Sequence, residues 1–326
     1  MKNKWFVSLL MVVVMMCACW TGAGADEKRK TFTSGDYEYA LLDDGTVEIT
    51  KYKGKAERLA IPDTLDGKRV TAIGEQAFSF CSSLTIISIP DSVAQIGENP
   101  FAACSSLKSI SVSPEHPYFA TIDGVLFRKA DKTLISYPAG ISSSTYTIPQ
   151  GITSIGDSAF SYCYFLTSVS IPDSVEQIGT NPFAACFELK SISASPDHPY
   201  FATIDGVLFR KADKALISYP ASISSSTYTI PRGITAIGDS AFSSCDSLTS
   251  VSIPDSVTSI GDEAFYSCSS LTSVNIPDSV TSIGDYAFGD CSNLTLTVPR
   301  NSYALEYAKA NNIPYTYPDA NDWLNN

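Results

Sequence analysis

Short apolar segments alternate with polar ones along most of this chain, in a pattern that returns at a fixed spacing. Between residues 248 and 253 the apolar side chains are Leu248, Val251 and Ile253. Ser250 and Ser252 lie between them. Successive side chains of a β-strand point to opposite faces. We therefore expect a strand whose Val251 and Ile253 face a core while the two serines face outward.

A turn and a return to the core follow this strand. Pro254 has no amide hydrogen for a strand ladder and is expected to end the strand. Val257 and Ile260 then point back toward the core. Gly261 permits an unusual backbone conformation. Asp262 is placed to cap a short helical turn after it.

The unit made of this strand and turn repeats along the chain. The Ile-Pro pair at Ile253 returns at Ile276, which is 23 residues later. One unit of that length cannot bury its own apolar side, so units must stack. The predicted architecture is a solenoid with the phenylalanine of each unit at the centre of its core. Equivalent Ile-Pro or Val-Pro pairs begin at Ile61, Ile89, Ile148, Ile171, Ile230, Ile253, Ile276 and Val298.

Two of the steps between these pairs are longer because each contains an extra module. The modules cover residues 113–147 and 195–229 and share the sequence Tyr-Phe-Ala-Thr-Ile-Asp-Gly-Val-Leu-Phe-Arg. Asp-Gly between alternating apolar residues is typical of a tight turn, so each module is predicted to be a β-hairpin that continues the stack. The stretch 89–170 aligns with 171–252 with about 13 differences, which indicates an internal tandem duplication.

The two ends of the solenoid need caps, because a terminal coil would otherwise expose its apolar side. Residues 26–60 contain two alternating segments and are predicted to form an N-terminal β-hairpin cap. The solenoid itself is expected over 61–299. Residues 300–326 are predicted to be a C-terminal cap that includes a helix at 303–311.

The unit resembles that of the BspA-like, or Treponema pallidum-type, leucine-rich repeat family, whose pattern is L-x-x-I-x-I-P-x-x-V-x-x-I-x-x-x-A-F-x-x-C-x-x-L. Seven units carry it, most clearly 148–170, 230–252, 253–275 and 276–297, and Pro100 and Pro182 replace its Ala. The resemblance implies an α/β repeat solenoid. This would be a right-handed coil with a parallel β-sheet on the concave face and short helical or 3-10 turns on the convex side. It also implies cell-surface adhesion, with host matrix proteins or other microbial surfaces as partners.

The charge balance narrows the range of partners. The chain has 326 residues, is 44% hydrophobic and carries a net charge of −12. Nucleic-acid binding needs clusters of Lys and Arg. The basic cluster at 28–30 is interpreted as part of a solvated tail. Nucleic acid is therefore not expected as a partner.

The first 25 residues have the features of a signal peptide. Lys2 and Lys4 precede an apolar run at 6–19 that is short for a membrane span. The small residues up to Ala25 match a cleavage site. We expect export, with the mature protein secreted or associated with the cell surface or outer membrane. Lipidation at Cys19 is the alternative to cleavage after Ala25.

Seven cysteines occupy one position, three residues after the phenylalanine of each unit. No C-x-x-C occurs and no His lies near these cysteines in sequence, so a zinc site is not expected. Stacked side chains point in parallel directions, which disfavours a disulfide between adjacent coils. We expect a structural column of buried free thiols. Its members are Cys81, Cys104, Cys163, Cys186, Cys245, Cys268 and Cys291.

No cofactor, metal or catalytic site is predicted, and the chain is expected not to be an enzyme. His116 and His198 occupy equivalent positions in the two modules, with no identifiable partner for acid–base catalysis. They are interpreted as solvated loop residues. Columns of Asp after Gly and after Pro could bind calcium, but turns and caps favour Asp for structural reasons. The sequence contains no G-x-S-x-G, H-E-x-x-H, P-loop or dinucleotide-binding motif.

Candidate partner-binding residues come from two places. The outward strand positions are small and polar and could bind a partner through many weak hydrogen bonds. Aromatic residues of the modules would be stronger anchors where they are exposed. The candidates are Thr167, Ser168, Ser170, Lys190, Ser191, Thr249, Ser250, Ser252, Thr272, Ser273, Asn275, Tyr118, Phe119, Tyr200 and Phe201.

The sequence as a whole predicts an exported, non-enzymatic protein that binds other proteins at the cell surface. Two alternatives stay open. The array could be a structural spacer or co-aggregation element, or it could bind carbohydrate through exposed module aromatics. A coil with unusual outward residues would favour specific recognition over a spacer.

Overall fold

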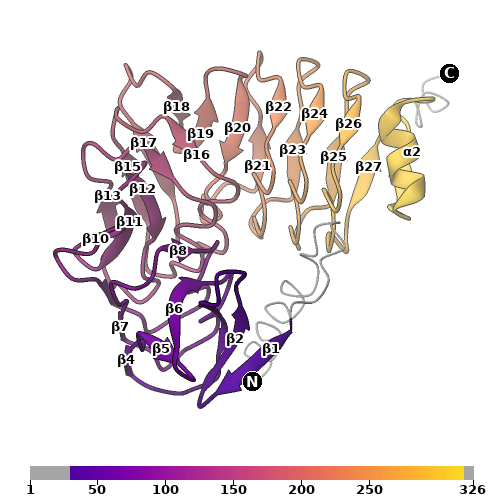
Figure 1. Cartoon of the computed structure of the whole chain (residues 1–326). Coiled ribbons are helices and arrows are strands. Elements are labelled where there is room, and N and C mark those ends of the chain that lie inside the picture. Colours follow the sequence, from indigo (N-terminus) through magenta and orange to yellow (C-terminus); the bar gives the residue numbers. More distant parts are fainter. Residues whose placement is uncertain (1–29, 319–326) are drawn as a thin grey trace, which may run out of the picture.

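The structure, a computed structural model, describes residues 30–318. Short strands stack one after another along an arc that runs from the N-terminal strands to a C-terminal helix (Figure 1). This confirms the predicted solenoid. The predicted signal peptide and Cys19 lie outside the described residues.

The strand predicted before each Ile-Pro pair is present and forms the first face of the solenoid. Its strands pair in parallel and in register, so Val169 lies beside Ile192 and Val251 beside Val274. All four side chains are buried. The strands are β4 (Arg58–Ala60), β7 (Ile86–Ser88), β9 (Ser109–Ser111), β13 (Thr145–Thr147), β15 (Ser168–Ile171), β17 (Ser191–Ala194), β21 (Thr227–Thr229), β23 (Ser250–Ser252), β25 (Ser273–Asn275) and β27 (Thr295–Thr297).

A second set of parallel strands forms where the sequence indicated only a return to the core, and makes up the second face. Six of these nine strands are two residues long, and four of the six bury an isoleucine. In β24, Ile260 pairs with Ile237 on one side and Ile283 on the other. The strands are β6 (Lys68–Ile73), β8 (Gln95–Ile96), β12 (Thr133–Ser136), β14 (Ser154–Ile155), β16 (Gln177–Ile178), β20 (Ala215–Ser218), β22 (Ala236–Ile237), β24 (Ser259–Ile260) and β26 (Ser282–Ile283).

The third face, called the turn face, consists of hydrogen-bonded turns, and the short helical turns expected here are absent from the described repeats. Each turn contains residues with positive φ, such as Ser244 at 59°. Such residues break a helix and direct alternate amides toward the next coil. The Phe242 amide donates to the carbonyl of Ala264 at 2.7 Å, and the Ser244 amide to that of Tyr266 at 2.8 Å. The turn face comprises residues 74–83, 97–106, 156–165, 179–188, 238–247, 261–270 and 284–293.

A column of aromatic rings runs through the core. Phe242, Phe265 and Phe288 stack with successive ring centroids 4.8 and 5.0 Å apart and with nearly parallel planes. Tyr219 of the second module takes the place of phenylalanine in its own coil and stacks on Phe242 at 5.1 Å. Aromatic pairs at this spacing stabilise by more than their buried area alone. The column therefore favours one register between neighbouring coils.

Each extra module contains the predicted hairpin. In the first module, β10 (Phe119–Ile122) and β11 (Val125–Arg128) pair antiparallel, and β12 returns beside β11 and pairs in parallel with β14. In the second module, β18 (Phe201–Ile204), β19 (Val207–Arg210) and β20 repeat this arrangement. The hairpins interrupt both faces, so each face is made of separate sheets.

Both ends of the described chain cover the terminal coils. At the N-terminal end, β1 (Thr31–Ser34), β2 (Tyr37–Leu41) and β3 (Val47–Tyr52) are antiparallel, β3 joins β6 in parallel, and β5 (Thr64–Leu65) pairs with β6. At the other end, helix α2 (Tyr303–Ala310) begins at Ser302, whose hydroxyl accepts the Leu305 amide at 3.1 Å. Strand β28 (Tyr315–Thr316) then pairs with β27.

Replacing Phe265 by Ala should lower the free energy of unfolding by about 3–5 kcal/mol, because the ring is fully buried between two others in the column. Urea unfolding followed by circular dichroism measures this loss. Tyr286→Ser is the control, since Tyr286 is 56% exposed on the turn face. A Phe265 variant as stable as the Tyr286 variant would contradict the stacked core.

Candidate functional site

The predicted strand residues lie on the first face, in separate patches. Ser168 pairs with Ser191 across β15 and β17, and Ser250 with Ser273 across β23 and β25. These two pairs belong to different sheets, so the outward positions do not form one continuous sheet surface. The residues are half-buried or exposed, namely Thr167, Ser168, Ser170, Lys190, Ser191, Thr249, Ser250, Ser252, Thr272, Ser273 and Asn275.

Several of these side chains already link neighbouring coils. The Thr249 hydroxyl donates to the carbonyl of Ser226 at 3.0 Å, and the Thr272 hydroxyl to that of Thr249 at 3.0 Å. The hydroxyls of Ser191 and Ser168 lie 3.2 Å apart. The first face therefore offers a partner fewer free hydrogen-bonding groups than its sequence suggests.

The aromatic candidates of the modules divide into exposed and buried residues. Tyr118 is 47% exposed and Tyr200 is 42% exposed. Phe119 and Phe201 are each only 1% exposed and pack in the core. Phe119 and Phe201 are therefore too buried to contact a partner directly, whereas Tyr118 and Tyr200 remain candidate binding residues.

The histidines interpreted as solvated are buried, so that prediction is wrong. His198 accepts hydrogen bonds at Nδ1 from the amides of Tyr200 and Phe201, both at 3.2 Å, and its Nε2 lies 3.0 Å from the carbonyl of Pro172. His116 makes the corresponding contacts in the first module. This set of partners requires a neutral ring with its proton on Nε2. Each histidine therefore fastens its module to an earlier coil.

Two adjoining hollows lie over the second face, in equivalent parts of the duplicated sequence. One, of about 450 Å³, lies over β20, β22, β24 and β26, and the other, of about 520 Å³, over β12, β14 and β16. Ile178 and Gly179 line both. We call the pair the second-face groove. Its floor includes small residues such as Ala236, Ser259 and Gly261.

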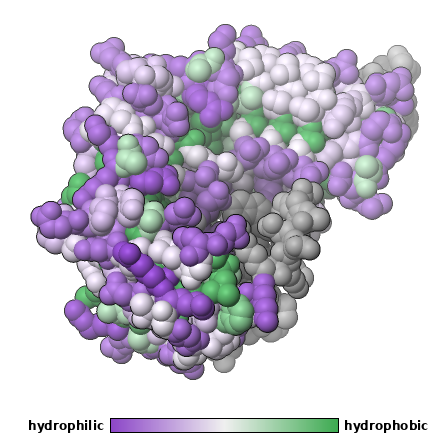
Figure 2. Space-filling view, viewed as in Figure 1, coloured by the Kyte–Doolittle hydropathy of each residue, from purple (hydrophilic) through white to green (hydrophobic). Residues whose placement is uncertain are grey.

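The second-face groove has a mixed lining. Figure 2 shows hydrophobic side chains beside hydrophilic ones over the part of the molecule that carries β22, β24 and β26. Asp239 and Asp262 line the hollow, and the Asp239 carboxylate accepts the Asp262 amide at 2.9 Å. Sites for small molecules are mostly apolar and enclose their ligand. This open, partly acidic groove suits a long partner better than a small substrate.

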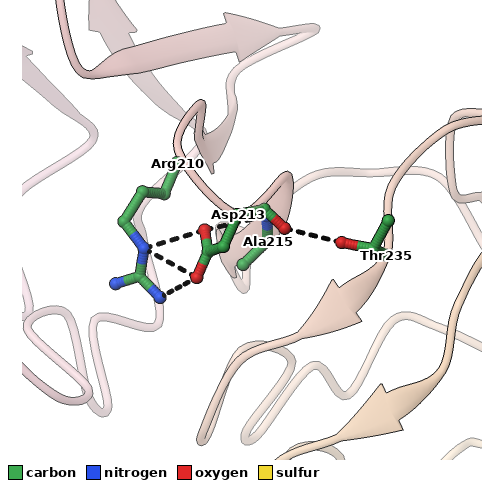
Figure 3. A network of polar contacts seen from close by, with 4 residues as sticks. All are labelled: Arg210, Asp213, Ala215 and Thr235. Atoms are coloured by element: carbon green, nitrogen blue, oxygen red, sulfur yellow. Dashed lines mark hydrogen bonds and ion pairs between the residues drawn. The ribbon is translucent and has the colours of Figure 1, made fainter.

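A charged turn between β19 and β20 forms part of the groove wall. Arg210 points at Asp213, with Nε 2.9 Å and Nη2 2.7 Å from the carboxylate oxygens (Figure 3). The Ala215 amide donates to the same carboxylate at 3.3 Å, and the Thr235 hydroxyl donates to the Asp213 carbonyl at 2.6 Å. The hydrogen bond from Arg210 holds the pKa of Asp213 below its usual value. The first module repeats this network around Asp131.

The seven cysteines are free thiols. The thiols of Cys268 and Cys291 donate to the carbonyls of Phe242 and Phe265 in the preceding coil, both at 3.0 Å. Burial raises the pKa of Cys245. Within residues 30–318, no three His, Cys, Asp or Glu side chains gather closely enough to hold a metal ion. The column is therefore a structural link between coils.

Alkylation of the native protein should label Cys81 and Cys291 before the other five thiols. Both are only half-buried, and a hydrogen bond from the neighbouring thiol lowers the pKa of each. A lower pKa and greater access both favour the reactive thiolate. Timed iodoacetamide labelling with peptide mass mapping measures the order. Equal labelling of all seven cysteines in the native protein would contradict the structure. A cysteine that stays unlabelled in urea until a reductant is added would be part of a disulfide, which would contradict the column of free thiols.

Replacing His198 by Asn should flatten the dependence of stability on pH. Burial is the main cause that lowers the pKa of His198 below its ordinary value of 6.5, so the unfolded chain binds a proton more readily than the folded one. The stabilisation is complete above 6.5 and is lost as the pH falls toward the lower folded pKa. Urea unfolding between about pH 7 and pH 5 compares wild type with His198→Asn. Equal losses of stability in both proteins would contradict this role.

The solenoid resembles solved bacterial leucine-rich repeat proteins. One from Eubacterium ventriosum is 23% identical over 83% of this chain and 73% of its own, with a TM-score of 0.55. A leucine rich cell surface protein from Faecalibacterium prausnitzii is 29% identical over 92% of this chain and 98% of its own, with a TM-score of 0.42. The pneumococcal vaccine antigen PcpA is 21% identical over 83% and 82%, with a TM-score of 0.44. No curated protein matches the chain.

The repeat units themselves match a known family. The family described as BspA type leucine rich repeat region matches in six copies, over residues 52–143, 135–216 and 213–312. These are the units whose Phe and Cys side chains form the two columns of the core. The match covers more than half of the sequence, and the chain belongs to the BspA-type leucine-rich repeat family.

Proposed function

We propose that this chain is an exported, non-enzymatic binding protein that attaches its cell to proteins of a host matrix or of another microbial surface. The observation that carries the proposal is the second-face groove, which is open and runs over successive coils. Stacked repeats present extended binding surfaces of this kind. Fold alone does not assign a function, so the surface chemistry must supply the specificity.

Export is supported by the signal peptide predicted at residues 1–25. Lipidation at Cys19 would hold the protein at the surface, and a bound partner could do the same. The described residues include no helix with the length and apolar character that a membrane span requires. In this proposal the solenoid lies outside the cell, held there by a lipid on Cys19 or by its bound partner.

Arginine substitutions distinguish the two sheet faces. The double variant Ser259→Arg, Ser282→Arg places two bulky side chains in the second-face groove, on β24 and β26. The matched control, Ser250→Arg with Ser273→Arg, places them on the first face, on β23 and β25. The mature protein is immobilised and exposed to purified matrix proteins and to intact bacterial cells. We expect the groove pair to weaken binding by at least about tenfold, a loss of about 1.4 kcal/mol, and the first-face pair to leave it unchanged.

Two other outcomes would correct the proposal. Loss of binding only in the first-face pair would move the contact to the predicted residues around Ser250 and Ser273. Wild-type protein that binds neither matrix proteins nor cells would contradict the proposed function itself.

Carbohydrate binding is a second candidate, favoured by the exposure of Tyr118 and Tyr200 at equivalent places in the two modules. Flat aromatic rings can pack against the apolar face of a sugar. Binding to a glycan array that is lost in a Tyr118→Ser, Tyr200→Ser variant would support this candidate over protein binding.

A further inference from the structure

The turn face carries charge of one sign. Its seven segments contain no Lys or Arg. Burial, followed by the nearby charges of Asp157 and Glu75, raises the pKa of Glu98, so these carboxylates lie close enough to repel one another. A surface of this kind attracts positively charged partners. Its carboxylates are Glu75, Glu98, Asp157, Glu188, Asp239, Asp246, Asp262, Glu263, Asp285 and Asp290.

An aromatic strip crosses this acidic face in the middle of the chain. Ring centroids are 6.4 Å apart between Phe80 and Tyr162, 6.2 Å between Tyr162 and Tyr164, and 6.3 Å between Tyr164 and Phe187. Phe80 is 41% exposed, and Phe165, next to Tyr164 in sequence, is 50% exposed. We call these five residues the aromatic strip. Tyr164 and Phe187 are half-buried, and Tyr162 is buried beneath them. Exposed and half-exposed apolar groups that gather in this way mark interaction sites.

The coil does not need these rings in order to fold. The two copies of the duplicated segment differ at about 13 positions, and four of them replace a ring of the strip by a small or acidic side chain. Tyr162 is the buried member of the strip and packs with small side chains from adjacent coils, including Ala103, Ala139 and Ala185. The counterparts in the other copy are Ser244 for Tyr162, Asp246 for Tyr164, Ser247 for Phe165 and Ser105 for Phe187.

We propose that the aromatic strip is a docking site for a basic protein surface, whose apolar side chains pack on the rings while its Lys and Arg side chains meet Glu188, next to Phe187 in sequence, and the other carboxylates of the turn face. Arg and Lys also bind favourably over aromatic faces. The inference rests on the proposed binding function and adds a partner class. The turn face adjoins the second-face groove and shares Asp157, Asp239 and Asp262 with its lining, whereas none of the five rings of the strip lines the groove. Charge complementarity selects this occupant, because a second copy of the chain, with a net charge of −12, would repel the face.

Three synthetic peptides of equal length test the proposal by titration calorimetry with the mature protein: one of Lys and Leu, one of Glu and Leu, and one of Lys and Ser. We expect the Lys–Leu peptide to bind at least about tenfold more tightly than either of the others, because it alone supplies both positive charge and apolar contacts. Its affinity should fall as salt is raised from about 0.05 to 0.5 M, which screens the carboxylates.

The matched variant carries Tyr164→Asp, Phe165→Ser and Phe187→Ser, the residues that the other copy has at these positions. It should retain wild-type unfolding behaviour and bind the Lys–Leu peptide at least about tenfold more weakly. Tyr286→Ser removes an exposed tyrosine from the same face outside the strip and should change binding by less than about twofold.

Any of three results would overturn the docking site. These are undiminished binding by the strip variant, absence of Lys–Leu binding to wild type, and equal binding of the Glu–Leu peptide. Competition by neutral oligosaccharides would indicate a sugar site instead, and would also overturn it. If wild type binds matrix proteins or cells and the strip variant does so equally well, the proposed function stands and only this docking site fails.

Discussion

Neighbouring coils of this solenoid must stack in one exact register. Each coil pairs with the next one through a strand on each of two faces. It also stacks an aromatic ring on the next ring and donates its turn amides to the next turn, so all these contacts must align at once. The ring spacing of 4.8 Å between Phe242 and Phe265 is close to the distance between paired strands. One set of contacts therefore satisfies the hydrogen bonds of both faces and the packing of the core together. Residues that point into the core, such as Phe242 and Phe265, therefore tolerate little change, while residues that point outward can vary without disturbing the register between coils.

The modules show how an insertion is accommodated under the same constraint. Each hairpin interrupts the parallel sheets, yet Tyr219 supplies the ring that stacks on Phe242 of the next coil, and His198 fastens the module to the carbonyl of Pro172 in an earlier coil. The strands and the Asp-Gly turns could be predicted from sequence, because alternation and turn chemistry are local. The burial of His198 could not, since its partner lies 26 residues earlier. The turns of the third face were expected to be helical because their positive-φ residues, such as Ser244, are not glycines.

In a repeat scaffold, a specific binding site requires surface residues that differ between equivalent positions of the coils. The predicted first-face residues repeat from coil to coil, and part of their hydrogen bonding joins the coils, as with Thr249 and Thr272. The second-face groove is lined by residues from several coils, so the sequence of one repeat unit does not predict it. One clue was present in sequence, because Asp131 and Asp213 recur with their Arg partners at the same place in both modules. The aromatic strip differs between otherwise similar copies, which a uniform spacer does not require.

Hydrogen–deuterium exchange of the turn-face amides measures whether the third face holds neighbouring coils together. The amides of Phe160, Phe242 and Phe265 each donate to a carbonyl in the next coil at 2.7–2.8 Å. These amides should exchange as slowly as those of β23 and β25, because all of them are released only when neighbouring coils separate. Exchange at the rate of the exposed residues 224–226 would contradict the claim that three hydrogen-bonded faces hold the coils in register.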